Sequence, residues 1–265
     1  MGAGYFIGGQ NGVIIALVLA GVMNFVSYWF SDKFVLAMYK AKPLPEEHHQ
    51  NIYRMVRHIA EKMKMPMPRL YMVNLPVPNA FATGRNKDHA VVAITPSIIE
   101  LLDERELEGV LAHELSHVQN RDILISSIAA TLAGALSYLS QIAYYGMMFG
   151  GGDRDERRGN PISAIVLILV TPIIATLLHL AISRSREYLA DETGAKALGD
   201  HEGLASALLK LHGYSKAHPL LGQPKHESTA HLFIVNPFKP SILLQLFSTH
   251  PPAEERVKRL KSVHL

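Results

Sequence analysis

The sequence contains no cysteine among its 265 residues. This absence excludes a thiol nucleophile, a cysteine-ligated metal and a disulfide framework. Charge is also scarce, because only 18% of the residues are Asp, Glu, Lys or Arg and the formal net charge is +3. So small a positive excess argues against a nucleic-acid partner. Hydrophobic residues make up 48% of the chain, which is high for a soluble protein.

Charged side chains are missing altogether from residues 1–31. Within this stretch, Gly12–Phe30 is long enough to cross about 30 Å of hydrocarbon as a helix. A signal peptide is the competing interpretation, but the stretch has no basic start and no small-residue cleavage site, which favours a retained anchor. Three lysines follow it, and by the positive-inside rule they place the downstream residues in the cytoplasm: Lys33, Lys40 and Lys42.

A second charge-free region runs over Ile123–Gly152 and is followed, after the charged loop Asp153–Arg158, by the apolar run Ile162–Ile182. The first run is rich in Ser and Thr, so either a membrane crossing or a long buried helix fits it, and we favour a crossing. The second run is the strongest candidate span in the sequence. If both cross, the segments before and after this hairpin lie on the same side of the membrane.

The segment between these regions carries the sequence His-Glu-Leu-Ser-His at residues 113–117. Residues four apart share one face of a helix, so His113 and His117 can hold one metal ion. Neutral imidazole suits zinc, and Glu114 is close enough to act as general base toward a water molecule at the metal. Asp103 and Glu106 have the spacing of a capping box and predict the start of this helix.

A catalytic zinc usually takes a third protein ligand, which must come from elsewhere in the chain. The best candidate is Glu187 in the segment EYLAD. Asp191 follows four residues later on the same helical face. It is expected to orient a ligand histidine from behind.

Four segments in this order carry a resemblance to a known family: PNAFATGR (Pro78–Arg85), HELSH, EYLAD and STHPP (Ser248–Pro252). The chain resembles the HtpX-type membrane zinc metalloproteases, relatives of the CaaX-prenyl endoproteases. The resemblance implies a zincin-like (gluzincin) fold and one zinc ion per chain. It also suggests that His250 hydrogen-bonds the oxyanion of the tetrahedral intermediate. Members commonly have two hydrophobic segments before the catalytic domain, whereas this sequence has room for one.

The run Ala90–Thr95 favours a strand. The resemblance suggests that its edge binds substrate, together with the PNAFATGR segment. The residues concerned are Asn79, Ala80, Val92 and Ala93. An ordinary core strand remains an equal alternative.

Periodicity predicts the remaining elements: helices over Asn51–Met65, His201–Leu211 and Ala253–Ser262, a short helix from Ser97, and a strand over Leu70–Val73. HESTAH contains a second histidine pair, His226 and His231. We reject it as a metal site because residues five apart lie about 140° from each other around a helix and do not share a face.

The predicted fold is mainly α-helical with a small β-sheet. A membrane anchor (1–31) precedes a metalloprotease domain (32–122 and 184–265), which a pair of transmembrane helices (123–183) interrupts. The predicted function is hydrolysis of polypeptides in the inner membrane, with the active site facing the cytoplasm. The resemblance implies that the substrates are membrane proteins that are misfolded or damaged under stress. The alternatives are a prenyl-protein protease and a membrane scaffold whose metal site has lost activity.

Overall fold

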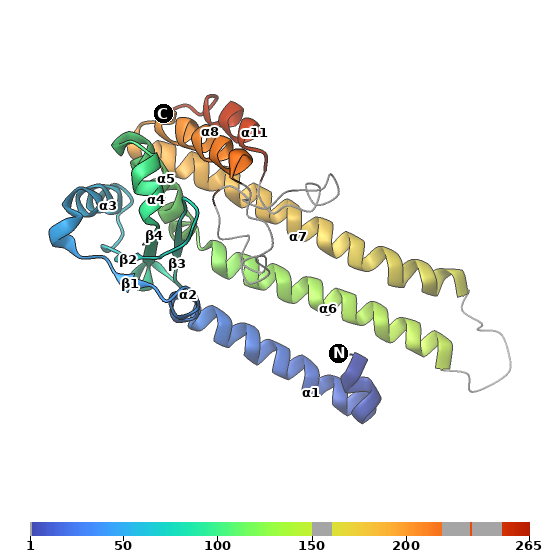
Figure 1. Cartoon of the computed structure of the whole chain (residues 1–265). Coiled ribbons are helices and arrows are strands. Elements are labelled where there is room, and N and C mark those ends of the chain that lie inside the picture. The colour runs from blue at the N-terminus through green and yellow to red at the C-terminus, as the bar shows by residue number, and fades with distance from the viewer. Residues whose placement is uncertain (1, 150–160, 219–233, 235–250) are drawn as a thin grey trace. The chain divides into compact units, whose positions relative to one another are not determined.

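A computed structural model describes residues 2–149, 161–218, 234 and 251–265 (Figure 1). The chain divides into two compact units. One comprises Met1–Tyr28 and Ile125–Ile182, and the other comprises Trp29–Leu124 and Ser183–Leu265. The second unit contains both the HELSH and the EYLAD segments.

Long helices build the first unit: α1 (Gly2–Trp29), most of α6 (Asp122–Phe149) and the first part of α7 (Pro161–Leu198). In this unit the Asn24 amide donates a hydrogen bond to the Thr131 hydroxyl at 3.2 Å. Over the residues that the structure describes, no helix combines the length and the apolarity needed to cross a membrane.

The second unit contains a four-stranded sheet of β1 (Lys42–Pro43), β2 (Arg69–Met72), β3 (Ala80–Thr83) and β4 (Val91–Ile94). The strand order is β1-β2-β4-β3, with β2 and β4 parallel and the other pairs antiparallel. The mainly helical fold with a small sheet is therefore confirmed. The sequence did not predict β1 or β3 as strands.

Register sorts the side chains of the three longer strands onto two faces. Leu70, Val92 and Ala82 pair in a row and join the main core. Tyr71, Ala93 and Phe81 form the next row and belong to a second, smaller cluster. This alternation is the period of two that a pleated strand imposes.

Helices cover both faces of the sheet. The main core packs α3 (Gln50–Lys62), α4 (Pro96–Leu101), α5 (Glu104–Gln119) and α8 (Glu202–Ala217) around one apolar centre. On the other face, Val35 and Tyr39 attach α2 (Ser31–Met38) to the second cluster, with the Tyr39 and Phe81 rings 5.5 Å apart. The last helix is α11 (Ala253–Leu260), and short 3-10 turns occupy Glu46–His48 and Lys87–His89.

The predicted capping box starts α5. The Asp103 side chain accepts the Glu106 amide N–H at 2.9 Å, and the Glu106 side chain accepts the Asp103 N–H at 3.0 Å. The Glu106 carboxylate also accepts hydrogen bonds from Ser206 and Lys210 of α8, at 2.6 and 2.7 Å. One buried carboxylate thus fixes the start of α5 and ties it to α8, which lies beside it (Figure 1).

Candidate metal centre

Helix α5 presents both histidines of the HELSH segment at one point. The Nε2 atoms of His113 and His117 lie 3.1 Å apart. His113 is buried, and Glu114 between them is only 7% exposed. The single-face geometry predicted from the four-residue spacing is confirmed.

Helix α7 brings Glu187 to the same point. One carboxylate oxygen of Glu187 lies 3.6 Å from Nε2 of His113, and the other lies 3.6 Å from Nε2 of His117. Ligand atoms about 2.0–2.1 Å from a tetrahedral zinc ion stand roughly 3.3–3.4 Å from one another. The donor set of two imidazoles and one carboxylate therefore fits zinc in both chemistry and spacing. Among the described residues, these three form a group able to hold a metal ion.

Each histidine is held at its other ring nitrogen by a carboxylate. Nδ1 of His113 lies 2.9 Å from Asp191, as expected from the sequence, and Nδ1 of His117 lies 2.6 Å from Asp122. A carboxylate only accepts hydrogen bonds, so each Nδ1 donates its proton to its carboxylate, and Nε2 is the ring nitrogen that faces Glu187. Asp122 was missed because it lies beyond the end of the HELSH helix, where helical spacing no longer applies.

Arg256 on α11 is the other residue that sequence reasoning missed. Its guanidinium donates two hydrogen bonds to Asp191, at 2.6 and 2.9 Å, and lies 3.3 Å from Glu187. The side chain is 1% exposed. The sequence could have indicated this role, because Arg256 lies on the apolar side of an amphipathic helix together with Ala253 and Leu260, both of which are buried.

The charges of the site explain how its pKa values move. Burial lowers the pKa of His117, but the hydrogen bond to Asp122 and the negative charges of Glu187 and Glu114 outweigh it and raise this pKa to about 9. Burial raises the pKa of Asp191, but the Arg256 charge and the hydrogen bonds from His113 and Arg256 hold it below its usual range. The carboxylates around the imidazoles therefore favour positive charge at this point.

The candidate base Glu114 faces the sheet. One of its oxygens accepts a hydrogen bond from the Ala82 backbone N–H of β3 at 3.1 Å. Because the carbonyl of Asn79 accepts from Thr95, next to β4, alternation turns Asn79 and Phe81 toward β4 and turns Ala80 and Ala82 toward the other edge. That outer edge of β3 therefore lies beside Glu114.

The prediction that Val92 and Ala93 present an exposed strand edge is wrong. β4 lies between β2 and β3, so both of its edges are used in the sheet, and all four of its residues are buried. Within the described residues the outer strand on this side is β3. Asn79 is buried, and its side chain accepts a hydrogen bond from the Ile234 N–H at 3.2 Å. His250, His226 and His231 lie outside the described residues.

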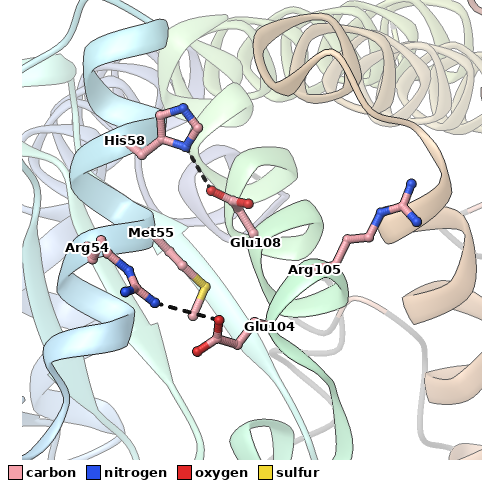
Figure 2. A pocket seen from close by; sticks show the side chains of 6 residues that line it. All are labelled: Arg54, Met55, His58, Glu104, Arg105 and Glu108. Carbon is pink, nitrogen blue, oxygen red and sulfur yellow. Dashed lines mark hydrogen bonds and ion pairs between the residues drawn. The ribbon is translucent and has the colours of Figure 1, made fainter.

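A pocket of about 480 Å³ opens elsewhere, between α3 and α5 (Figure 2). Polar side chains pair across it, with Arg54 3.6 Å from Glu104 and His58 3.0 Å from Glu108. Arg105, at its rim, pairs with Asp200. These lining residues include none of the candidate site residues, and their charges neutralise one another, so we do not assign the chemistry to this pocket.

Comparison with known proteins gives a consistent result. The family model described as Peptidase family M48 matches residues 46–264. A Protease HtpX homolog of Desulforapulum autotrophicum is 52% identical over 260 residues, which cover 97% of this chain and 83% of that protein. A Protease HtpX homolog of Pyrococcus furiosus is 51% identical over 264 residues, 99% of this chain and 90% of its own.

A solved structure shares the fold at low identity. The crystal structure of S. mikatae Ste24p superposes with a TM-score of 0.65 at 19% identity, over 97% of this chain and 60% of that chain. At this identity the likeness concerns the fold alone.

Proposed function

Because the chain belongs to peptidase family M48, we propose that it is a membrane-bound endopeptidase that cleaves misfolded or damaged membrane proteins at the cytoplasmic face of the inner membrane. The chain is a zinc metallopeptidase of this family, with His113, His117 and Glu187 as its zinc-binding residues. The observation that carries the proposal is that these three ligands converge beside Glu114, a buried carboxylate aimed at the outer edge of β3.

Zinc held by these residues would polarise the scissile carbonyl and bring the pKa of a water molecule to about 7. Glu114 accepts the proton of the attacking water and delivers it to the leaving amine. Its hydrogen bond from Ala82 keeps the carboxylate beside the metal ligands rather than turned toward solvent. Asp191 holds His113 in the tautomer that leaves Nε2 available.

The outer edge of β3 is the place that we propose for the substrate backbone. An extended peptide added there would continue the sheet and bring its scissile bond past Glu114. Ala80 has its backbone N–H and C=O on this edge, and Ala82 has its C=O there, because the Ala82 N–H bonds Glu114. Asn79 fixes the start of the strand. His250, three residues before the helix that carries Arg256, remains our candidate for a donor to the oxyanion.

Apolar surface supports the membrane location. Residues 1–31 and 123–152 carry no charge, and α1 exposes large apolar side chains, with Met23 being 69% accessible. At α2, the N-cap residue Phe30 and the helical residues Phe34 and Met38 recur every four residues and are all exposed. Lys33, three residues after Phe30, lies 5.3 Å from its ring centroid. An apolar stripe flanked by lysine is typical of a helix that contacts lipid headgroups.

The decisive experiment removes the base and keeps the metal. Glu114→Gln should retain about one zinc per chain, because Glu114 is not a ligand, and should lose turnover of an unfolded protein such as casein by about 10²–10⁴-fold. Both quantities are measured on protein purified in detergent, by metal analysis and by peptide release.

Glu108→Gln is the matched control, since Glu108 lies on the same helix but pairs with His58 in a pocket that includes none of the metal ligands. It should leave zinc content and turnover unchanged. Turnover near wild type in Glu114→Gln would overturn the proposed mechanism.

A further inference from the structure

Asp122 is shared between a zinc ligand and an arginine from a distant segment. One carboxylate oxygen lies 2.6 Å from Nδ1 of His117. The other accepts hydrogen bonds from Arg186, from Nε at 2.6 Å and from Nη2. Asp122 is 7% exposed, so these contacts are made away from bulk water.

The local backbone explains why Asp122 can reach back to His117. Helix α5 ends at Gln119, and Arg121 adopts the left-handed conformation with φ 57°. This turn redirects the chain, so that Asp122 becomes the first residue of α6. Arg186 also donates a hydrogen bond to the Asn120 carbonyl at 2.8 Å, so a side chain of α7 holds the backbone of this turn.

The arrangement repeats the one found at the first histidine. His113 is held by Asp191, which is held by Arg256, and His117 is held by Asp122, which is held by Arg186. At each histidine, a carboxylate orients the Nδ1 atom of the ring and a guanidinium orients the carboxylate. The two arginines enter from different helices, α11 and α7.

We propose that Asp122 is a positioning residue for His117, and that Arg186 acts on the zinc site through Asp122. The inference rests on the proposed metallopeptidase function. Helix α6 leaves the second unit, which holds the metal ligands, at Leu124, two residues after Asp122, and α7 enters it at Ser183, three residues before Arg186. The pair therefore fixes the catalytic ends of both interrupting helices relative to one another and makes the orientation of His117 depend on that spacing.

A purely structural role is the alternative. A carboxylate in the first turn of α6 also stabilises that helix, because it faces the positive end of the helix dipole. In that case the loss of Asp122 would lower the stability of the protein and leave its metal binding intact. Zinc affinity and the coordination spectrum separate the two roles, and neither needs turnover.

The test uses the full-length protein in detergent, with zinc affinity measured by competition titration and coordination by the visible absorption of the cobalt(II)-substituted protein. Asp122→Ala should weaken zinc binding by about 10- to 100-fold and change the cobalt spectrum. Asp122→Asn should lose less, because the amide oxygen still accepts from Nδ1. Arg186→Gln should also lose less than Asp122→Ala, since Asp122 stays but is no longer held.

The double variant Asp122→Ala/Arg186→Gln decides whether the arginine acts through the aspartate. We expect it to match Asp122→Ala alone, and multiplied losses would overturn the coupling. Glu192→Ala on α7 is the control, because the Glu192 side chain is 46% exposed, pairs with Lys196 and should change nothing.

Wild-type zinc affinity and an unchanged cobalt spectrum in Asp122→Ala, with a lower melting temperature, would overturn the positioning role. These readouts are independent of the proposed function. A wild-type protein that binds zinc but cleaves no polypeptide would contradict the endopeptidase proposal. The zinc titrations would still test the positioning role of Asp122.

Discussion

Asp191 holds two groups at once, the Nδ1 of His113 and the guanidinium of Arg256. Removing one partner from a buried ion pair costs about 3–5 kcal/mol, because the other charge is left uncompensated. An alanine at position 191 would therefore disturb both the zinc site and the stability of the fold. Asparagine is the better test, since its oxygen can still accept a hydrogen bond from His113.

At the residue scale, the three acids of α7 should rank by their contacts. Glu187→Ala removes a ligand and should abolish stable zinc binding. Asp191→Asn should weaken zinc affinity by about 10- to 100-fold, as expected when a residue that orients a ligand is changed. Glu192→Ala should have no effect, because the half-exposed Glu192 side chain contacts Lys196 and none of the metal ligands. Zinc titration of the three purified variants measures the order.

Full zinc affinity in Glu187→Ala would contradict the assignment of the third ligand, and His250 would be tested next. A thermal melt of the same proteins serves as the control. It detects any variant in which the zinc site is lost because the fold is lost.

At the scale of the elements, the close approach of α5 and α8 positions the HELSH helix. A Cβ added at Gly109 would lie 2.6 Å from the Leu204 backbone nitrogen, and one at Gly203 would lie 2.6 Å from the Arg105 carbonyl oxygen. Both obstacles are backbone atoms, which cannot rotate away. The two glycines therefore allow the helices to pack in direct backbone contact.

Gly109→Ala should destabilise the protein by about 1–3 kcal/mol, the usual cost of overpacking a core. Gly213→Ala is the matched control on α8, because its added Cβ meets nothing within 4 Å. It should leave stability unchanged or raise it by up to about 1 kcal/mol, since alanine is the better helix former. Unfolding by denaturant measures both, and equal stability of Gly109→Ala and wild type would contradict the packing argument.

At the scale of the whole molecule, residues 125–182 belong to the first unit, and the unit that holds the metal ligands is assembled from the stretches on either side, Trp29–Leu124 and Ser183–Leu265. Its two halves contribute different ligands, His113 and His117 from the first and Glu187 from the second. Both halves must therefore lie on the same side of any membrane. This is the physical basis for expecting the hairpin to go out and return.

The absence of cysteine makes this topology directly testable. A cysteine at Asn160, between the two hydrophobic runs, should react with a membrane-impermeant thiol reagent added to intact cells. A cysteine at Lys42 should react only after lysis, because the lysines that follow the first hydrophobic stretch favour the cytoplasm. Labelling of position 160 only after lysis would contradict the crossing hairpin.

The sequence by itself determined the features that depend on local spacing. The HELSH spacing placed two imidazoles and a carboxylate on one helix, and the Asp103–Glu106 capping box located the start of that helix. Glu187 and Asp191 were predicted together because they share a helical face. In each case the relevant residues are neighbours along one helix, where the backbone period fixes their relative position.

Only the tertiary structure decided which distant groups surround these residues. Asp122 depends on the left-handed turn at Arg121, and Arg256 reaches Asp191 from a helix 65 residues away in sequence. The strand order moved the candidate substrate edge from β4 to β3. The alternation of residues within a strand does not predict this order. Such contacts arise from packing between segments, and packing depends on the whole core rather than on the local pattern of the chain.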